Sequence, residues 1–330
     1  GDVEIDEYEG VSLHILAGGS VTIGTATITG VEQGIAGTDF LQETVTLSDG
    51  TAVDIDGSAR PTLDVRAGVE PSALGTPPPI LEVTGESITD TFSDGGPSVF
   101  DASSADITVG DVLVEALSAA APNGLVLLTN QYRPSRENFA GSITVTGEGK
   151  YEEGIDVSND LGDSRGDIFI DSRDNVFMLN SSLFTAAVGE AGDITVLAQE
   201  TVRFDSLDSE GNYLPSGASS GVLNLEELEY SAEESERLLR LPEASVLERL
   251  DFLESLDTVE GRAGNIRISA ENLELLNGVI LSADTLLGTG NAGNITIDVE
   301  ETVRFAGIGF DDIDNRNVSS YVSSSSYNGG

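Results

Sequence analysis

Cysteine and tryptophan are absent from the 330-residue chain, and histidine and lysine occur once each, as His14 and Lys150. The absence of cysteine excludes disulfides, thiol catalysis and cysteine-ligated zinc. A single histidine excludes a metal site built from several histidines. A Ser-His-Asp triad would have to use His14, which no Gly-x-Ser-x-Gly sequence surrounds. Aromatic residues make up only 5%, so the core must consist of Ile, Val, Leu and Ala.

Basic residues are also few, with 15 Lys and Arg against 58 Asp and Glu and a formal net charge of −43. Binding to nucleic-acid phosphates needs clustered Lys and Arg, so we expect no nucleic-acid partner. No apolar run reaches the ~18 residues of a membrane span, so we expect no membrane insertion. The acidity has two interpretations, solubility with resistance to self-association, or bridging of a surface layer by divalent cations.

The two ends of the chain carry no visible targeting segment. It begins Gly1-Asp2-Val3 without Met and ends Tyr327-Asn-Gly-Gly330. We expect an internal segment of a longer protein, so the missing export signal is uninformative.

A repeat organises the carboxyl-terminal half. Gly192-Asp-Ile-Thr-Val196 is followed by Glu200-Thr-Val-Arg-Phe204, and Gly293-Asn-Ile-Thr-Ile297 is followed by Glu301-Thr-Val-Arg-Phe305. A unit of about 25 to 29 residues cannot bury its own core and must stack on its neighbours. Further copies begin at Gly166, at Gly264 and, more loosely, at Gly141.

The residues within each unit alternate, with Ile194 and Val196 on one face and Thr195 on the other, as in a half-buried strand. No helical segment separates these strands, which argues against a doubly wound sheet. An antiparallel sandwich fits the strand lengths but does not explain why each unit's glycine is followed by Asp or Asn. A solenoid explains it, because these residues would then stack about 4.8 Å apart, form amide ladders and place neighbouring aspartates in repulsion. The stacked residues would be Asp167, Asp193, Asn265 and Asn294.

The predicted fold class is therefore all-β, a parallel β-helix (solenoid) with a short helical insertion. We predict regular coils over 141–330 and irregular amino-terminal coils over 1–140, with about eleven coils in a rod about 50 Å long. The amino-terminal strands are expected at Val11-Leu13-Ile15, Val21-Ile23, Val53-Ile55, Leu63-Val65, Leu81-Val83, Ile107-Val109 and Val112-Val114.

The helical insertion is predicted over 222–258, where leucines recur at helical spacing among glutamates and Pro242 divides the segment into a hairpin. It lies inside the long step from Gly192 to Gly264. Two interpretations stay open, helices that pack an apolar stripe onto the solenoid, or an element that docks a partner.

The repeats resemble those of a known family. Asn291-Ala-Gly-Asn-Ile-Thr-Ile297 and Asn277-Gly-Val-Ile-Leu-Ser-Ala283 are similar to repeats of filamentous-haemagglutinin-like exoproteins of the cyanobacterial type. Ala121-Pro-Asn-Gly-Leu-Val-Leu-Leu-Thr-Asn-Gln-Tyr132 and Pro61-Thr-Leu-Asp-Val-Arg-Ala-Gly68 resemble their central region. The resemblance covers roughly 10–330. It implies a right-handed parallel β-helix, two-partner secretion through an outer-membrane transporter, a secreted or outer cell-surface location, and adhesion.

Few residues are candidates for chemistry. His14 has the parity of outward-facing residues, so we expect it on the surface. Arg203 and Arg304 recur in the repeat, and we expect them to pair with acids on adjacent coils. The acidic segments Asp2–Glu9 and Asp311–Asn317 are either solvated loops or calcium ligands, because Ca²⁺ prefers oxygen ligands. No catalytic or cofactor-binding residue is predicted, no cofactor is required, and metal ligands stay unassigned, with calcium as the one candidate.

Three functions fit these observations. The first is a non-enzymatic secreted adhesin or attachment scaffold whose partners are cell-surface glycans or other surface proteins. The second is a structural subunit of an extracellular fibril, sheath or surface layer, formed by self-association. The third is a polysaccharide-acting enzyme on the same fold, which would need carboxylate pairs at a set separation. We expect the first, a protein that is not an enzyme.

Overall fold

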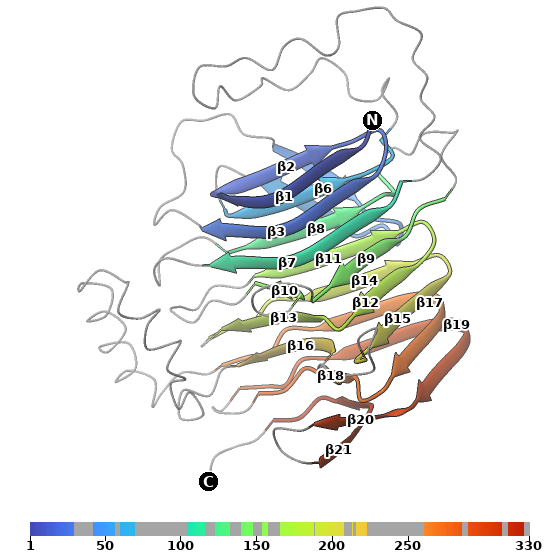
Figure 1. Ribbon diagram of the computed structural model, residues 1–330. Coiled ribbons are helices and arrows are strands. Elements are labelled where there is room, and N and C mark those ends of the chain that lie inside the picture. Colours follow the sequence, from blue (N-terminus) through green and yellow to red (C-terminus); the bar gives the residue numbers. More distant parts are fainter. Residues whose placement is uncertain are drawn as a thin grey trace, which may run out of the picture.

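The computed structural model describes residues 1–29, 42–56, 60–69, 105–115, 123–132, 140–147, 154–157, 166–187, 189–207, 213, 216–222, 261–285, 290–311 and 316–326. Every regular element within these ranges is a β-strand, and 18 of the strands form one hydrogen-bonded network (Figure 1). The strands stack from the amino terminus at the top of Figure 1 to the carboxyl terminus at the bottom. The all-β prediction is therefore confirmed for the described part of the chain.

The network consists of three parallel ladders, which we name A, B and C. Ladder A comprises β2 (Ser12–Leu16), β6 (Thr62–Arg66), β8 (Leu125–Thr129), β11 (Asp167–Ser172), β14 (Ile194–Ala198) and the first parts of β17 (Ile266–Leu276) and β19 (Ile295–Ala306). Ladder B comprises the first parts of β1 (Val3–Gly10), β3 (Val21–Thr29) and β7 (Ile107–Glu115), then β9 (Ile143–Thr146), β12 (Val176–Leu179), β15 (Thr201–Asp205) and the second parts of β17 and β19. Ladder C comprises the second parts of β1, β3 and β7, then β10 (Gly154–Asp156), β13 (Ser182–Ala187), β16 (Gly217–Val222), β18 (Ile280–Ser282) and β22 (Tyr321–Ser323).

The chain visits the ladders in the cyclic order A, B, C, and one such passage is a coil. Coils 1 to 7 begin with β2, β6, β8, β11, β14, β17 and β19, and β1 precedes them. The expectation of about eleven coils is wrong for the described residues. The amino-terminal coils take up far more sequence than the 25 to 29 residues of the repeat, because segments are inserted between their strands.

Inward-facing side chains stack in columns because the coils pair in register. One column of ladder B runs through every coil and is filled throughout by apolar side chains. Its members are Ile5, Ile23, Val109, Val145, Met178, Phe204, Leu275 and Phe305. Between coils 1 and 6 these side chains are almost fully buried, so the interior is a continuous apolar core.

The last coil leaves its inward side chains uncovered. Val303 is 46% exposed, Phe305 50% and Val322 40%, although their columns are buried in the coil above. Among the described strands β19 pairs only with β17, so one of its edges is unpaired.

A glycine column forms the corner between ladders C and A. A Cβ on Gly192 would lie 1.6 Å from the carbonyl oxygen of Gly166, and one on Gly264 would lie 2.0 Å from that of Gly192. Gly293 meets Gly264 in the same way, at 1.8 Å. Only glycine fits there, which explains why the repeat begins with it.

The predicted ladder of Asp and Asn side chains follows these glycines. Asp167 Oδ1 accepts from the backbone N–H of Asp193 at 3.0 Å, and Asp193 Oδ1 accepts from that of Asn265 at 2.7 Å. Asn265 Oδ1 in turn accepts from the N–H of Asn294 at 3.1 Å. Each side chain therefore satisfies a donor of the next coil, and the prediction of stacked residues is confirmed.

A second polar ladder, which the repeat did not indicate, forms the corner between ladders A and B. Asp2 accepts from the N–H of Ser20, Ser20 from that of Asp106, and Asp106 from that of Ser142. Gly141-Ser-Ile-Thr-Val145 belongs to this corner, because Ile143 pairs with Val176. Its assignment as a copy of the Gly166 unit is wrong, since Leu125 pairs with Asp167 and Gly124 therefore aligns with Gly166.

Two antiparallel hairpins lie outside the ladders. They are β4 (Gln42–Thr46) with β5 (Ala52–Asp56), and β20 (Ile308–Asp311) with β21 (Arg316–Ser319). The expectation that Val53-Ile55 is a coil strand is therefore wrong, because alternation alone does not distinguish a coil strand from a hairpin strand. Leu81-Val83 and the helical insertion at 222–258, apart from Val222 at the end of β16, lie outside the described residues. The division at 140/141 stays a prediction, and the ladders run across it without interruption.

We predict that Gly192→Ala lowers the free energy of unfolding by about 1–3 kcal/mol, because the added methyl group overlaps a backbone oxygen that cannot move without breaking the ladder. Urea denaturation measures the change. Gly221→Ala is the matched control, since its Cβ would meet only the Asp284 carbonyl oxygen at 3.2 Å. Equal stabilities for the two variants would contradict the role of the glycine column.

Candidate functional site

The outer faces of ladders A and B differ in what covers them. The hairpin β4–β5 packs on ladder A, where Val45, Leu47, Val53 and Ile55 are 1–3% exposed. They contact Leu125, Leu127, Leu197 and other apolar residues on the outer face of that ladder. Each buried side chain contributes roughly 1.5–3 kcal/mol relative to an exposed one. Ladder A is therefore closed to a ligand along most of its length.

A buried group of charges lies beneath this hairpin. The Arg66 guanidinium is fully buried and donates to both oxygens of Asp64, which is also fully buried, at 2.8 Å each. It also donates to Glu43 of β4 at 2.8 Å and lies 4.4 Å from the ring centre of Tyr132, whose hydroxyl donates to Glu43. Burial opposes the charge of Arg66, but hydrogen bonds and attraction from Asp64 and Glu43 outweigh it and raise the pKa of Arg66. These contacts hold the hairpin to the ladder.

The expectation that His14 is an exposed surface residue is wrong. It lies on the outer side, as its parity indicates, but its side chain is only 15% exposed. Pairing of β2 with β6 places Asp64 beside it, and His14 Nδ1 lies 3.1 Å from Asp64 Oδ2. His14 therefore belongs to the buried charge group.

Asp171 fixes the tip of the same hairpin. Its two oxygens accept from the hydroxyl and the N–H of Ser48 at 2.6 and 2.9 Å. Burial raises the pKa of Asp171, and the hydrogen bonds from Ser48 oppose that rise. Asp49 pairs with Arg267 at 2.9 Å.

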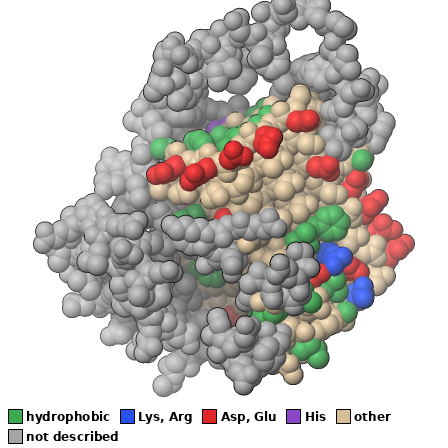
Figure 2. Space-filling view, viewed as in Figure 1, with side chains coloured by type: hydrophobic (Ala, Val, Ile, Leu, Met, Phe, Trp, Pro, Cys, Tyr) green, Lys and Arg blue, Asp and Glu red, His purple; other side chains and the backbone are tan. Residues whose placement is uncertain are grey.

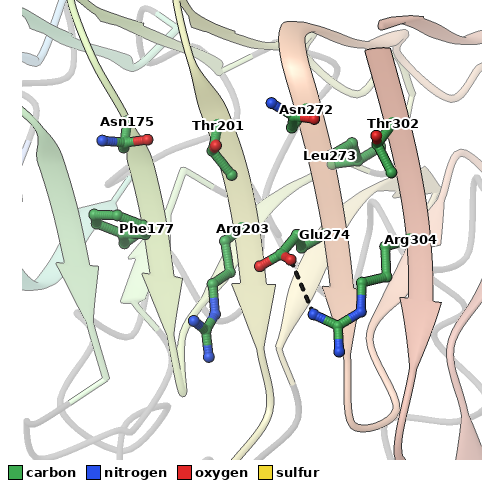
Figure 3. A pocket seen from close by; sticks show the side chains of 9 residues that line it. All are labelled: Asn175, Phe177, Thr201, Arg203, Asn272, Leu273, Glu274, Thr302 and Arg304. Carbon is green, nitrogen blue, oxygen red and sulfur yellow. Dashed lines mark hydrogen bonds and ion pairs between the residues drawn. The ribbon is translucent and has the colours of Figure 1, made fainter.

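The outer face of ladder B carries an open groove of about 470 Å³. Two rows of outward side chains cross four successive coils there (Figure 3). The first row is Asn175, Thr201, Asn272 and Thr302, and the second is Phe177, Arg203, Glu274 and Arg304. Leu273 also lines the groove. Its volume lies within the range of ligand pockets, which makes the groove the candidate functional site.

Charges alternate along the second row. Arg304 Nη1 pairs with Glu274 at 3.0 Å across adjacent coils, as predicted. Arg203 instead pairs with Asp205 of its own strand, at 2.5 Å, so the prediction of an adjacent-coil partner is wrong for this arginine. Arg203 Nε is buried and has no hydrogen-bond partner among the described residues. In Figure 3 the guanidinium groups of Arg203 and Arg304 point the same way, with Glu274 between them.

The acidic segments show no metal site in the described ranges. No three Asp, Glu or His side chains there come close enough to hold a metal ion. Asp2 has a structural role, because it accepts from the N–H of Ser20. Acidic side chains form a row across the amino-terminal strands in Figure 2. Residues 312–315 of the predicted loop Asp311–Asn317 lie outside the described residues, so calcium binding stays a prediction.

Comparisons with known proteins give no relative. No family model, no curated protein and no solved structure matches the chain. The resemblance to filamentous-haemagglutinin-like exoproteins therefore stays a prediction that rests on the motifs. The described residues also contain no helix long and apolar enough to span a membrane.

The sequence identified two members of the groove, Arg203 and Arg304, through the repeated Glu-Thr-Val-Arg-Phe. It missed Phe177 and Glu274, although both follow from aligning the units, since each occupies the arginine position of its own coil. No sequence signal indicated the cover on ladder A, because it comes from a hairpin far away in the chain.

Replacement of the two paired arginines should have unequal effects on stability. Arg66→Met leaves the buried Asp64 without its arginine partner, with His14 alone beside it, and should cost about 3–5 kcal/mol. Arg304→Gln removes an exposed pair and should cost less than about 1 kcal/mol. Urea denaturation measures both changes. A similar loss of unfolding free energy in the two variants would contradict the conclusion that the contacts of Arg66 hold the hairpin to the ladder.

Proposed function

We propose that this chain is a right-handed parallel β-helix that acts as a non-enzymatic attachment scaffold outside the cell, with surface glycans as partners. The observation that carries the proposal is the unbroken apolar core of successive coils with an open, polar groove on ladder B. A solid interior suits a stiff support that presents an external surface.

The parallel ladders support the right-handed winding. Each ladder strand is connected to the next one by a crossover through the other two ladders. Crossovers between parallel strands of one sheet are right-handed in about 98% of cases. A crystal structure of the chain tests this point directly.

The secreted location rests on the motifs. The repeats resemble exoproteins that an outer-membrane transporter exports by two-partner secretion. The net charge of −43 fits a protein that stays soluble outside the cell.

Beads coated with the chain should be retained on surfaces coated with extracellular polysaccharide, whereas beads coated with the heat-unfolded chain should not. The same polysaccharides should show no new reducing ends or unsaturated sugars after incubation. Release of such products would favour the enzyme hypothesis over the scaffold. Absence of bead retention on every polysaccharide and cell surface would exclude the attachment function.

A further inference from the structure

We infer that the ladder B groove binds an acidic polysaccharide, whose sugars carry carboxylate or sulfate groups, and this inference rests on the proposed attachment function. The polymer would run across the coils, along the two rows of side chains (Figure 3).

The shape of the groove fits a chain-like ligand. Its rows take one residue from each of four neighbouring coils, so they extend for about 14 Å along the stack at the usual spacing of paired strands. The groove is open to solvent, so an extended polymer can lie in it without entering the core.

Arginine provides the anion recognition. A guanidinium group donates to a carboxylate or sulfate through two parallel hydrogen bonds, which a neutral sugar cannot accept as strongly. Arg203 keeps its Nε–H without a partner although that atom is buried, and an unmet buried donor is costly. The same guanidinium pairs with Asp205 at 2.5 Å, so an acidic group of the ligand must share or replace that carboxylate and draw the Nε–H outward to satisfy it. The side chain of Arg304 is 57% exposed and points in the same direction.

The other side chains of the groove suit a sugar. Phe177 stands at one end of the charged row and offers an apolar ring surface. Asn175, Thr201, Asn272 and Thr302 offer amide and hydroxyl groups, each of which both donates and accepts hydrogen bonds, as sugar hydroxyls do. The groove thus combines an apolar surface, neutral polar groups, two cations and the carboxylate of Glu274 within a chain of net charge −43.

Glu274 competes with the ligand. Its carboxylate lies between the two arginines in the row and pairs with Arg304. An anionic ligand must displace this pairing or lie beside a like charge. Removal of the charge at position 274 should therefore strengthen polymer binding. If the row of side chains only stabilised the fold, this substitution would not change binding.

The rest of the acidic surface favours local over long-range recognition. At 0.15 M ionic strength the screening length is about 8 Å, so acids more than about two coils away act weakly on a bound polymer. A nucleic acid would need many phosphate contacts along its length, and the groove provides two arginines.

Binding of the full chain to polygalacturonate, a carboxylated polymer, and to dextran sulfate, a sulfated one, tests the inference, with uncharged dextran as the neutral probe. We expect wild-type binding to one or both acidic polymers and not to dextran. The double variant Arg203→Gln/Arg304→Gln should bind at least about tenfold more weakly, since hydrogen bonds between charged groups are lost. Glu274→Gln should bind about three- to tenfold more tightly.

Matched controls separate the groove from net charge. The double variant Arg262→Gln/Arg267→Gln removes the same charge. Arg267 lies in β17 like Glu274 but on ladder A, so this variant should bind the polymers with the affinity of wild type. Far-ultraviolet circular dichroism and the urea midpoint verify folding. Equal losses in both double variants, or no change in the groove double variant and in Glu274→Gln, would overturn the inference while attachment stands. If wild type binds none of the polymers but is retained on cells, the ligand class is wrong; if it is retained nowhere, the attachment function fails as well.

Discussion

Backbone hydrogen bonds join each strand of the three ladders to the strand one coil away. The register is kept within each ladder, and the shift between β17 and β19, at Ala270/Asn272, falls where these strands pass from ladder A to ladder B. This pairing decides the position of every other group. It stacks Ile5 to Phe305 in one apolar column, glycine against the carbonyl oxygen of glycine, and Asp or Asn beside the N–H of the next coil. A change of register by one residue would turn each apolar column outward. The repeat in the sequence is therefore the record of this pairing.

The same register also determines the surfaces. Asp64 and Arg66 occupy outward positions of ladder A at the base of the hairpin β4–β5. The hairpin covers this face, and its apolar side chains form a second buried core with those of the ladder. Outward positions of ladder B stay open and form rows of side chains, among them the alternating Arg203, Glu274 and Arg304. One architecture thus produces a covered face on ladder A and an open groove on ladder B.

The regular parts of the chain were predictable because local sequence patterns, such as strand alternation and the Gly-Asx pair, decide which side chains face inward and where the corners lie. Alternation located Ile194, Val196, Val202 and Phe204 in the core, and the Gly-Asx pair located the corner between ladders C and A. The error at Gly141 arose because two different corners use glycine followed by a small polar residue. The packing of the hairpin and the pairing that places His14 beside Asp64 depend on contacts between residues far apart in the sequence, which periodicity does not report. The groove depends on aligning coils through insertions of unequal length.

The hairpin β4–β5 has a consequence for how the molecule resists pulling. Repeat stacks unfold coil by coil when each coil contacts only its neighbours. This hairpin contacts coil 2 through Glu43 and Arg66, coil 4 through Ser48 and Asp171, and coil 6 through Asp49 and Arg267. The hairpin bridges coils 2 to 6, so a force that separates coil 3 from coil 4 must also break the contacts of the hairpin. Coils 2 to 6 should therefore yield to tension together, as one mechanical unit.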